Sequence, residues 1–92
     1  MTTQNTMRPY MIDVGGGCYH DANDIATIIP VSRIPKDELS SMKIHESSLI
    51  DLTNDTGIAK TLIRCKSDGY ELLSSYEPET ILKNISGGQN YE

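Results

Sequence analysis

The stretch MIDVGGGCYHDANDIATIIP, residues 11–30, decides the expected fold of this 92-residue chain. Residues 10–14 fit a first strand, and residues 25–31 are apolar enough to form a buried one. The three glycines at positions 15–17 permit backbone angles that other residues avoid, which indicates a sharp turn or a close backbone approach. A phosphate-cradling loop is the weaker interpretation, because the Lys-Ser/Thr ending of a nucleotide-binding loop is missing.

A proline-led helix should follow these strands. Pro30 cannot donate the next hydrogen bond of a ladder, so the second strand should end there. Pro35 stands at the start of residues 35–43, and the acidic residues behind it occupy the first turn, where the helix dipole favours negative charge. We therefore predict a short helix whose inner face carries Leu39 and Met42.

The second half of the chain predicts three strands and a final helix. Residues 49–52 form an apolar run, and residues 60–66 and 70–75 flank the turn sequence Ser-Asp-Gly, a strong hairpin signal. Pro78 begins the last helix, and the glycine pair at 87–88 should end it. The apolar stripe of this helix consists of Ile81, Leu82 and Ile85.

The resulting order ββαβββα predicts an α+β fold, with one small domain at residues 9–86 and flexible tails at 1–8 and 87–92. The apolar fraction is 37%, below the usual range, and Phe and Trp are absent. A chain this short, without these large side chains, builds a thin core in isolation. We therefore expect a homo-oligomer, either a closed ring or a small even-numbered assembly, with a marginal monomer as the alternative.

Charge and cysteine content narrow the classes of function. Thirteen acidic against eight basic side chains give a net charge of −5, which weakens a DNA-binding role without excluding it. No apolar run is long enough to span a membrane, and the N-terminus lacks the hydrophobic core of a signal peptide, so we expect a cytoplasmic protein. In that compartment Cys18 and Cys65 should be free thiols.

Enzymatic chemistry is not expected. Two histidines in polar surroundings do not define a Ser-His-Asp order, and scattered acids do not indicate a paired-carboxylate site. Asp51 should hydrogen bond the neighbouring turn around Thr53 rather than act in catalysis. The sequence CYHD at 18–21 offers metal-binding side chains, but a closed zinc site needs four convergent groups, so neither a metal nor a cofactor is predicted.

Several short segments, taken in order, resemble one known family. The sequences IDVGGG (12–17), DAND (21–24) and LIDLT (49–53) are followed by EPET (77–80). Over about residues 11–85 this series is similar to the RemA-like family of extracellular matrix regulatory proteins. Members of that family are small bacterial DNA-binding regulators that assemble into rings. The resemblance implies an α+β scaffold and a ring-like homo-oligomer.

The chain departs from the family at the positions to which DNA contacts are attributed. Asp24 stands where the family has an arginine after Ala-Asn, and a carboxylate there would repel phosphate. The family's Arg-Arg-Thr-Arg run corresponds to a loop at residues 54–60, in which only Lys60 matches the last basic residue. The resemblance therefore implies a retained scaffold with weakened DNA binding.

The basic residues of the predicted hairpin suggest an anion site. Lys60, Arg64 and Lys66 have even spacings, so on a regular strand their side chains share one face with Leu62. Such a face could hold a phosphate or carboxylate, with Arg64 forming a bidentate contact. The alternative is the solvated face of an edge strand that its lysines keep soluble. The expected ligand-binding residues are Lys60, Arg64, Thr53, Asn54 and Thr56.

Three non-enzymatic functions compete. The leading one is a homo-oligomeric protein that captures a small phosphate-bearing ligand of the signalling-nucleotide type between its subunits, as a viral or mobile-element sequestering protein would. The first alternative is a RemA-like DNA-binding transcriptional regulator, because weak contacts repeated around a ring add up through effective concentration. The second alternative is a protein-interaction module whose acidic surface binds a basic partner.

Overall fold

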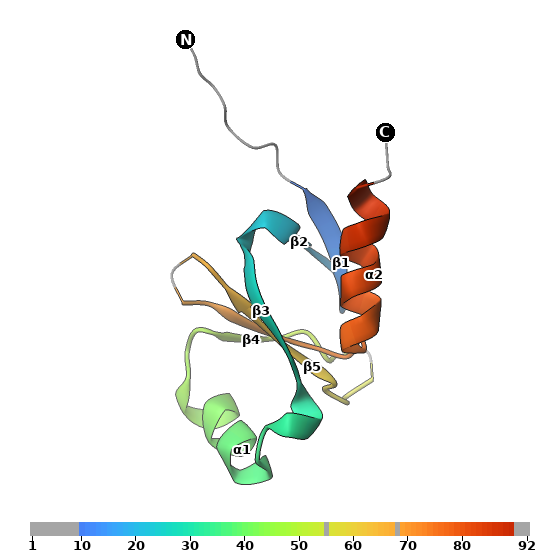
Figure 1. Cartoon of the computed structure of the whole chain (residues 1–92). Coiled ribbons are helices and arrows are strands. Elements are labelled where there is room, and N and C mark those ends of the chain that lie inside the picture. The colour runs from blue at the N-terminus through green and yellow to red at the C-terminus, as the bar shows by residue number, and fades with distance from the viewer. Residues whose placement is uncertain (1–9, 55, 68, 90–92) are drawn as a thin grey trace.

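A four-stranded sheet forms the centre of the structure, a computed structural model that describes residues 10–54, 56–67 and 69–89 (Figure 1). The strand order is β3 (Ile25–Pro30), β5 (Thr61–Cys65), β6 (Glu71–Ser74) and β4 (Leu49–Asp51). The pairs β3–β5 and β5–β6 are antiparallel, whereas β4 runs parallel to β6. The hairpin predicted around the Ser-Asp-Gly sequence is therefore confirmed.

A separate hairpin precedes this sheet. β1 (Met11–Gly15) pairs in antiparallel with β2 (Cys18–Asp21), and the three glycines at 15–17 all have positive φ. A Cβ on Gly16 would lie only 2.4 Å from the carbonyl oxygen of Leu52, so the two backbones approach too closely for a side chain. The predicted turn and close approach are both confirmed. The sequence did not predict the strand β2, because this segment is short and has no apolar alternation.

Two helices cover opposite faces of the four-stranded sheet. α1 (Lys36–His45) buries Met42 in a cluster with Leu62 and Leu73 on one face. On the other face, α2 (Pro78–Gln89) and the β1–β2 hairpin form the larger cluster (Figure 1). The buried residues of that cluster are Ile12, Val14, Leu52, Ile63, Cys65, Leu72 and Ile81. The two layers of helix around a mixed sheet confirm the α+β class.

The strand β5 lies inside the sheet and is buried on both faces. Leu62 and Ile63 are 1% and 0% exposed, and as neighbours on a strand they point to opposite clusters. The interpretation of this segment as an edge strand is therefore wrong, although the Arg64 side chain is 53% exposed. Lys66 follows the last residue of β5, so it does not share a strand face with Arg64.

Two further expectations need correction. Residues 25–31 do not form a fully buried strand: β3 lies at the edge of the sheet with Ala26 and Thr27 exposed, since among the described strands it pairs only with β5. The strand also ends at Pro30, as its missing donor predicted, and the short 3-10 turn η2 (Val31–Arg33) follows. The glycine pair at 87–88 does not end α2, because each helical glycine costs only about 1 kcal/mol.

The predicted tail at 1–8 lies outside the described residues, as do the last three residues of the predicted C-terminal tail. The remainder of that tail, residues 87–89, is the last turn of α2. Neither of the described helices has both the length and the apolar character that a membrane crossing requires.

Polar side chains fasten the β1–β2 hairpin to the rest of the fold. The Ser74 hydroxyl donates to the Val14 carbonyl at 2.6 Å, and the Tyr76 hydroxyl donates to Asp13 Oδ2 at 2.9 Å. The Asn84 side-chain amide donates to the Asp13 carbonyl at 2.9 Å. β1 is thus held to β6 and to α2 by side-chain hydrogen bonds.

Candidate functional site

The two cations expected to bind an anion lie at opposite ends of β5. Lys60 immediately precedes the strand, and four residues of a strand span about 13 Å. Lys60 Nζ lies 3.0 Å from Glu77 Oε2, and Arg64 Nε lies 2.7 Å from Glu71 Oε2. Each cation therefore has a carboxylate of its own, and the two do not converge on one point.

Arg64 is the less suitable of the two for an anionic ligand. The Glu71 side chain is only 12% exposed, and its hydrogen bond to Glu46 raises the pKa of Glu46. A phosphate at Arg64 would consequently meet two carboxyl groups. Arg64 is 53% exposed and Lys60 is 45% exposed, so the two pairs differ in the carboxylate: Glu77 is 54% exposed, and an ion pair with both partners exposed is weak. Lys60 can therefore exchange its partner for a ligand at small cost.

The polar residues expected to assist are in the loop between β4 and β5. Thr53 is buried, and its hydroxyl donates to Asp51 Oδ1 at 2.5 Å. The Thr56 hydroxyl accepts a hydrogen bond from the Ile58 amide at 3.1 Å, and Asn54 is exposed. Both hydroxyls thus stabilise the turns of their own loop, and the structural role predicted for Asp51 is confirmed.

This loop crosses the end of β6. The Leu52 amide donates to the Leu73 carbonyl on one side of β6, and the Lys60 amide donates to the Ser74 carbonyl on the other, each at 2.8 Å. Because neighbouring strands are about 4.8 Å apart, the backbones at the two ends of the loop are separated by roughly 10 Å. The five expected ligand residues are therefore not one cluster. Their role stays a prediction, and the geometry favours Lys60 among them.

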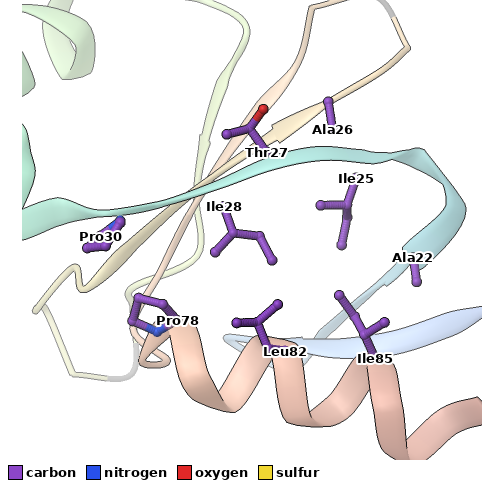
Figure 2. Close-up of a pocket in the computed structure, with 9 residues that line it drawn as sticks. All are labelled: Ala22, Ile25, Ala26, Thr27, Ile28, Pro30, Pro78, Leu82 and Ile85. Carbon is purple, nitrogen blue, oxygen red and sulfur yellow. The ribbon is translucent and has the colours of Figure 1, made fainter.

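An apolar groove lies between β3 and α2, with a volume of about 600 Å³ (Figure 2). Ile25 and Ile28 of β3 point toward Leu82 and Ile85 of α2 across this groove. Leu82 is 53% exposed, so its apolar surface is open to whatever enters. We refer to this feature as the β3–α2 groove.

A smaller pocket of about 350 Å³ adjoins the β3–α2 groove, and Pro30 and Pro78 line both. Lys60, Glu77 and Ser32 are among its lining residues. A cation and a hydroxyl therefore stand at the end of an apolar surface. Small-molecule sites typically combine apolar walls with a few polar groups of this kind.

Away from the groove, a cluster of polar side chains brings together three separate segments of the chain. His20 Nε2 lies 2.9 Å from Asp24 Oδ2 and 3.4 Å from Cys65 Sγ. The Ser67 hydroxyl and amide donate to the Asp24 carboxylate at 2.9 and 3.0 Å. Hydrogen bonding by Ser67 lowers the pKa of Asp24, whereas burial, with the nearby Asp24 and Glu71 carboxylates, raises the pKa of the Cys65 thiol.

This cluster does not have the geometry of a nucleophilic relay. In such a relay the histidine contacts the nucleophile through one ring nitrogen and the orienting acid through the other. Here Cys65 and Asp24 both contact Nε2 of His20. The sequence pointed to CYHD as a source of metal-binding groups, but His20 and Cys65 are 45 residues apart, and no local spacing signals their contact.

No protein-family model matches this chain, and no curated protein sequence matches it at a significant level. The resemblance to RemA-like proteins therefore stays a prediction from the short segments quoted above.

Proposed function

We propose that this protein is a non-enzymatic, homo-oligomeric binding protein that captures a small phosphate-bearing molecule of the signalling-nucleotide type. The observation that carries the proposal is the place of Lys60, where the β3–α2 groove adjoins a small polar pocket. The apolar groove suits the flat face of a nucleobase, and the ammonium group suits a phosphate.

The β3–α2 groove also supports self-association. β3 is an edge strand, and its outer backbone groups can pair with another strand. Leu82 adds exposed apolar surface beside it, in a chain whose composition predicts a thin core. We place a second copy of the chain against this face. Lys60 then lies at the rim of the interface, where a ligand is enclosed between subunits.

The energetics favour Lys60 over Arg64 as the phosphate contact. Exposed ion pairs contribute about 0–1 kcal/mol, so little is lost when Lys60 leaves Glu77. A hydrogen bond to a charged group contributes about 1.5–3 kcal/mol. Removing Lys60 should therefore weaken binding about tenfold to a hundredfold.

Calorimetric titration with a cyclic dinucleotide, with adenosine monophosphate and with inorganic phosphate tests the ligand. We expect a nucleotide to bind more tightly than inorganic phosphate, because only the nucleotide fills the groove. Lys60→Ala should weaken that binding by the factor given above, and Lys83→Ala, an exposed lysine on α2, should not. Equal affinity in the Lys60 variant, or an Arg64→Ala variant with the larger loss, would move the site away from the groove. Absence of nucleotide binding, with no small molecule retained in native mass spectrometry of the purified protein, would refute capture.

Light scattering on the same protein tests the assembly. We expect a mass of several chains at micromolar concentration, and Leu82→Lys should reduce it to one, since a charge in the apolar groove is costly to bury. Ile44→Lys is the matched control, because Ile44 is 75% exposed on α1, away from the groove. A single-chain mass for the unaltered protein would contradict self-association.

DNA is the weaker candidate ligand. The Asp24 carboxylate is held in place by Ser67 and His20, so negative charge is fixed where the family resemblance implies an arginine. We expect only weak binding to duplex DNA at physiological salt, with a shallow salt dependence, because each lost phosphate contact reduces the salt slope by about one unit. Tight, sequence-selective binding in a gel-shift titration would favour the regulator instead.

A further inference from the structure

We propose that His20, Asp24 and Cys65 form a binding site for one zinc-class divalent ion per chain, with a fourth coordination position open to water or an external ligand. The proposal is independent of the nucleotide site, since none of these side chains lines the β3–α2 groove or the pocket at Lys60.

The donor atoms are already gathered. His20 Nε2, an Asp24 carboxylate oxygen and Cys65 Sγ all lie within 4.8 Å of one another. The two closest separations are 2.9 Å between His20 and Asp24 and 3.4 Å between His20 and Cys65. Tetrahedral zinc, with bonds of about 2.0–2.3 Å, places its ligand atoms roughly 3.3–3.6 Å apart. The two separations from His20 are within a few tenths of an ångström of these values, and the Asp24 and Cys65 donor atoms, which lie within 4.8 Å of each other, would move together by up to roughly 1 Å on binding an ion.

The fold fixes the backbone that presents these groups. Cys65 is the register partner of Ile25, the residue after Asp24, and the Lys66 amide donates to the Asp24 carbonyl at 2.7 Å. The hydrogen bonds from Ser67 orient the Asp24 carboxylate. His20 comes from β2, which pairs with β1 rather than with the main sheet. Three elements thus meet at one point, which local sequence spacing does not require.

The partial burial of these three side chains and the chemistry of their donor groups both suit a bound metal ion. Cys65 is 7% exposed, and the His20 and Asp24 side chains are 26% and 21% exposed, so the site is covered on one side and open on the other. A thiolate, an imidazole and a carboxylate together favour zinc over magnesium or calcium, which prefer oxygen ligands. Three protein ligands with a fourth position for water are the ligand count of open rather than closed zinc sites.

Charge and protons balance in the bound state. Cys65 releases its thiol proton to solvent and binds as a thiolate, and His20 binds as neutral imidazole through Nε2 with its proton on Nδ1. The thiolate and the Asp24 carboxylate together neutralise the two positive charges of the ion. No oxidant or reductant is required.

Cobalt titration of the full chain, after removal of metal with EDTA, tests the site. We expect one Co²⁺ per chain, with a near-ultraviolet thiolate-to-cobalt charge-transfer band that equimolar Zn²⁺ removes. Asp24→Asn keeps the size of the side chain and an oxygen acceptor for Ser67, and it should weaken binding more than about a hundredfold, beyond the loss typical of outer-shell groups. Cys65→Ala should abolish the charge-transfer band. Cys18→Ser and His45→Asn, the matched exposed controls, should leave the band and the stoichiometry unchanged.

Circular dichroism separates metal loss from unfolding. If Cys65→Ala unfolds the chain, the Asp24→Asn variant decides the matter, since its change lies at the more exposed side of the cluster. A stoichiometry well below one, a band that persists without Cys65, or unchanged affinity in folded Asp24→Asn would each overturn the proposal.

Discussion

The hydroxyl of Ser74 donates a 2.6 Å hydrogen bond to the carbonyl of Val14, 60 residues earlier in the chain, and both residues are fully buried. The same hydroxyl accepts a hydrogen bond from the Tyr76 amide at 3.0 Å. Ser74→Ala would leave both backbone groups without this partner. We expect the free energy of unfolding to fall by about 1–3 kcal/mol in urea denaturation. Ser47→Ala, at an exposed position in the linker after α1, should change it by less than about 0.5 kcal/mol.

Gly16 and Gly17 allow a matched comparison within one turn. Both have positive φ, +63° and +76°, so alanine at either position should cost about 1–2 kcal/mol in backbone strain. Only at Gly16 would the new Cβ meet the Leu52 carbonyl, at 2.4 Å, whereas the space at Gly17 is open. Gly16→Ala should therefore destabilise the protein by a further 1–3 kcal/mol or so. Equal urea midpoints for the two variants would mean that the backbone approach to Leu52 relaxes freely.

Tyr10→Phe should leave the stability unchanged or raise it. Within the part of the chain that the structure describes, the Tyr10 hydroxyl is buried without a hydrogen-bond partner. Burying such a group costs about 1–3 kcal/mol, and phenylalanine keeps the ring that packs against the larger core cluster. Thermal unfolding of the two proteins side by side measures the difference. A clear loss of stability in the variant would show that the hydroxyl has a partner in solution.

The fall in the free energy of unfolding at acidic pH should depend on Asp51. Hydrogen bonding by the Thr53 hydroxyl lowers the pKa of Asp51 below its ordinary value of 3.8. Because the pKa is lower in the folded state, ionised Asp51 stabilises the protein above the unfolded-state pKa. That contribution disappears as the pH falls through the folded-state value. Asp51→Asn should therefore cost about 1 kcal/mol at pH 7, a small value because the residue is largely exposed, and little at low pH.

Thr53→Val provides the control for this pH effect. It keeps the buried shape of Thr53 but removes the hydroxyl that holds Asp51. In the Thr53→Val background, Asp51→Asn should cost less at pH 7 than it does in the unaltered protein. Urea denaturation at pH 7 and below pH 4 on all four proteins measures this coupling. Additive effects would show that the two side chains act independently.

The parts of the fold that the sequence predicted are those with local signals. The hairpin of β5 and β6 has a turn sequence between two apolar runs, and α1 has its proline and first-turn acids. β2 has no such signal: its four residues are polar or partly exposed, and they pair only because the preceding glycines return the chain alongside β1. The position of β5 between two layers also could not be read locally, since Arg64 made the strand look solvated.

In the candidate site, too, the features with local sequence signals were predicted and those set by tertiary contacts were not. The even spacing of Lys60 and Arg64 was visible in the sequence, but their carboxylate partners, Glu77 and Glu71, come from tertiary contacts across the sheet. The β3–α2 groove depends on two elements that are about 50 residues apart. Residue spacing predicts which side chains share a strand face. It does not predict which of them the rest of the fold will neutralise.

The hydrogen bond between the Asn84 side chain and the Asp13 carbonyl joins α2 to β1 across 71 residues. At about 5–20 residues per second, a ribosome needs roughly 4–14 s to synthesise the segment between them. Throughout that interval the apolar face of the nascent β1 has no helix to cover it. This protein must therefore complete its folding only after α2 has left the exit tunnel, and Ile12 and Val14 stay without their full cluster until then.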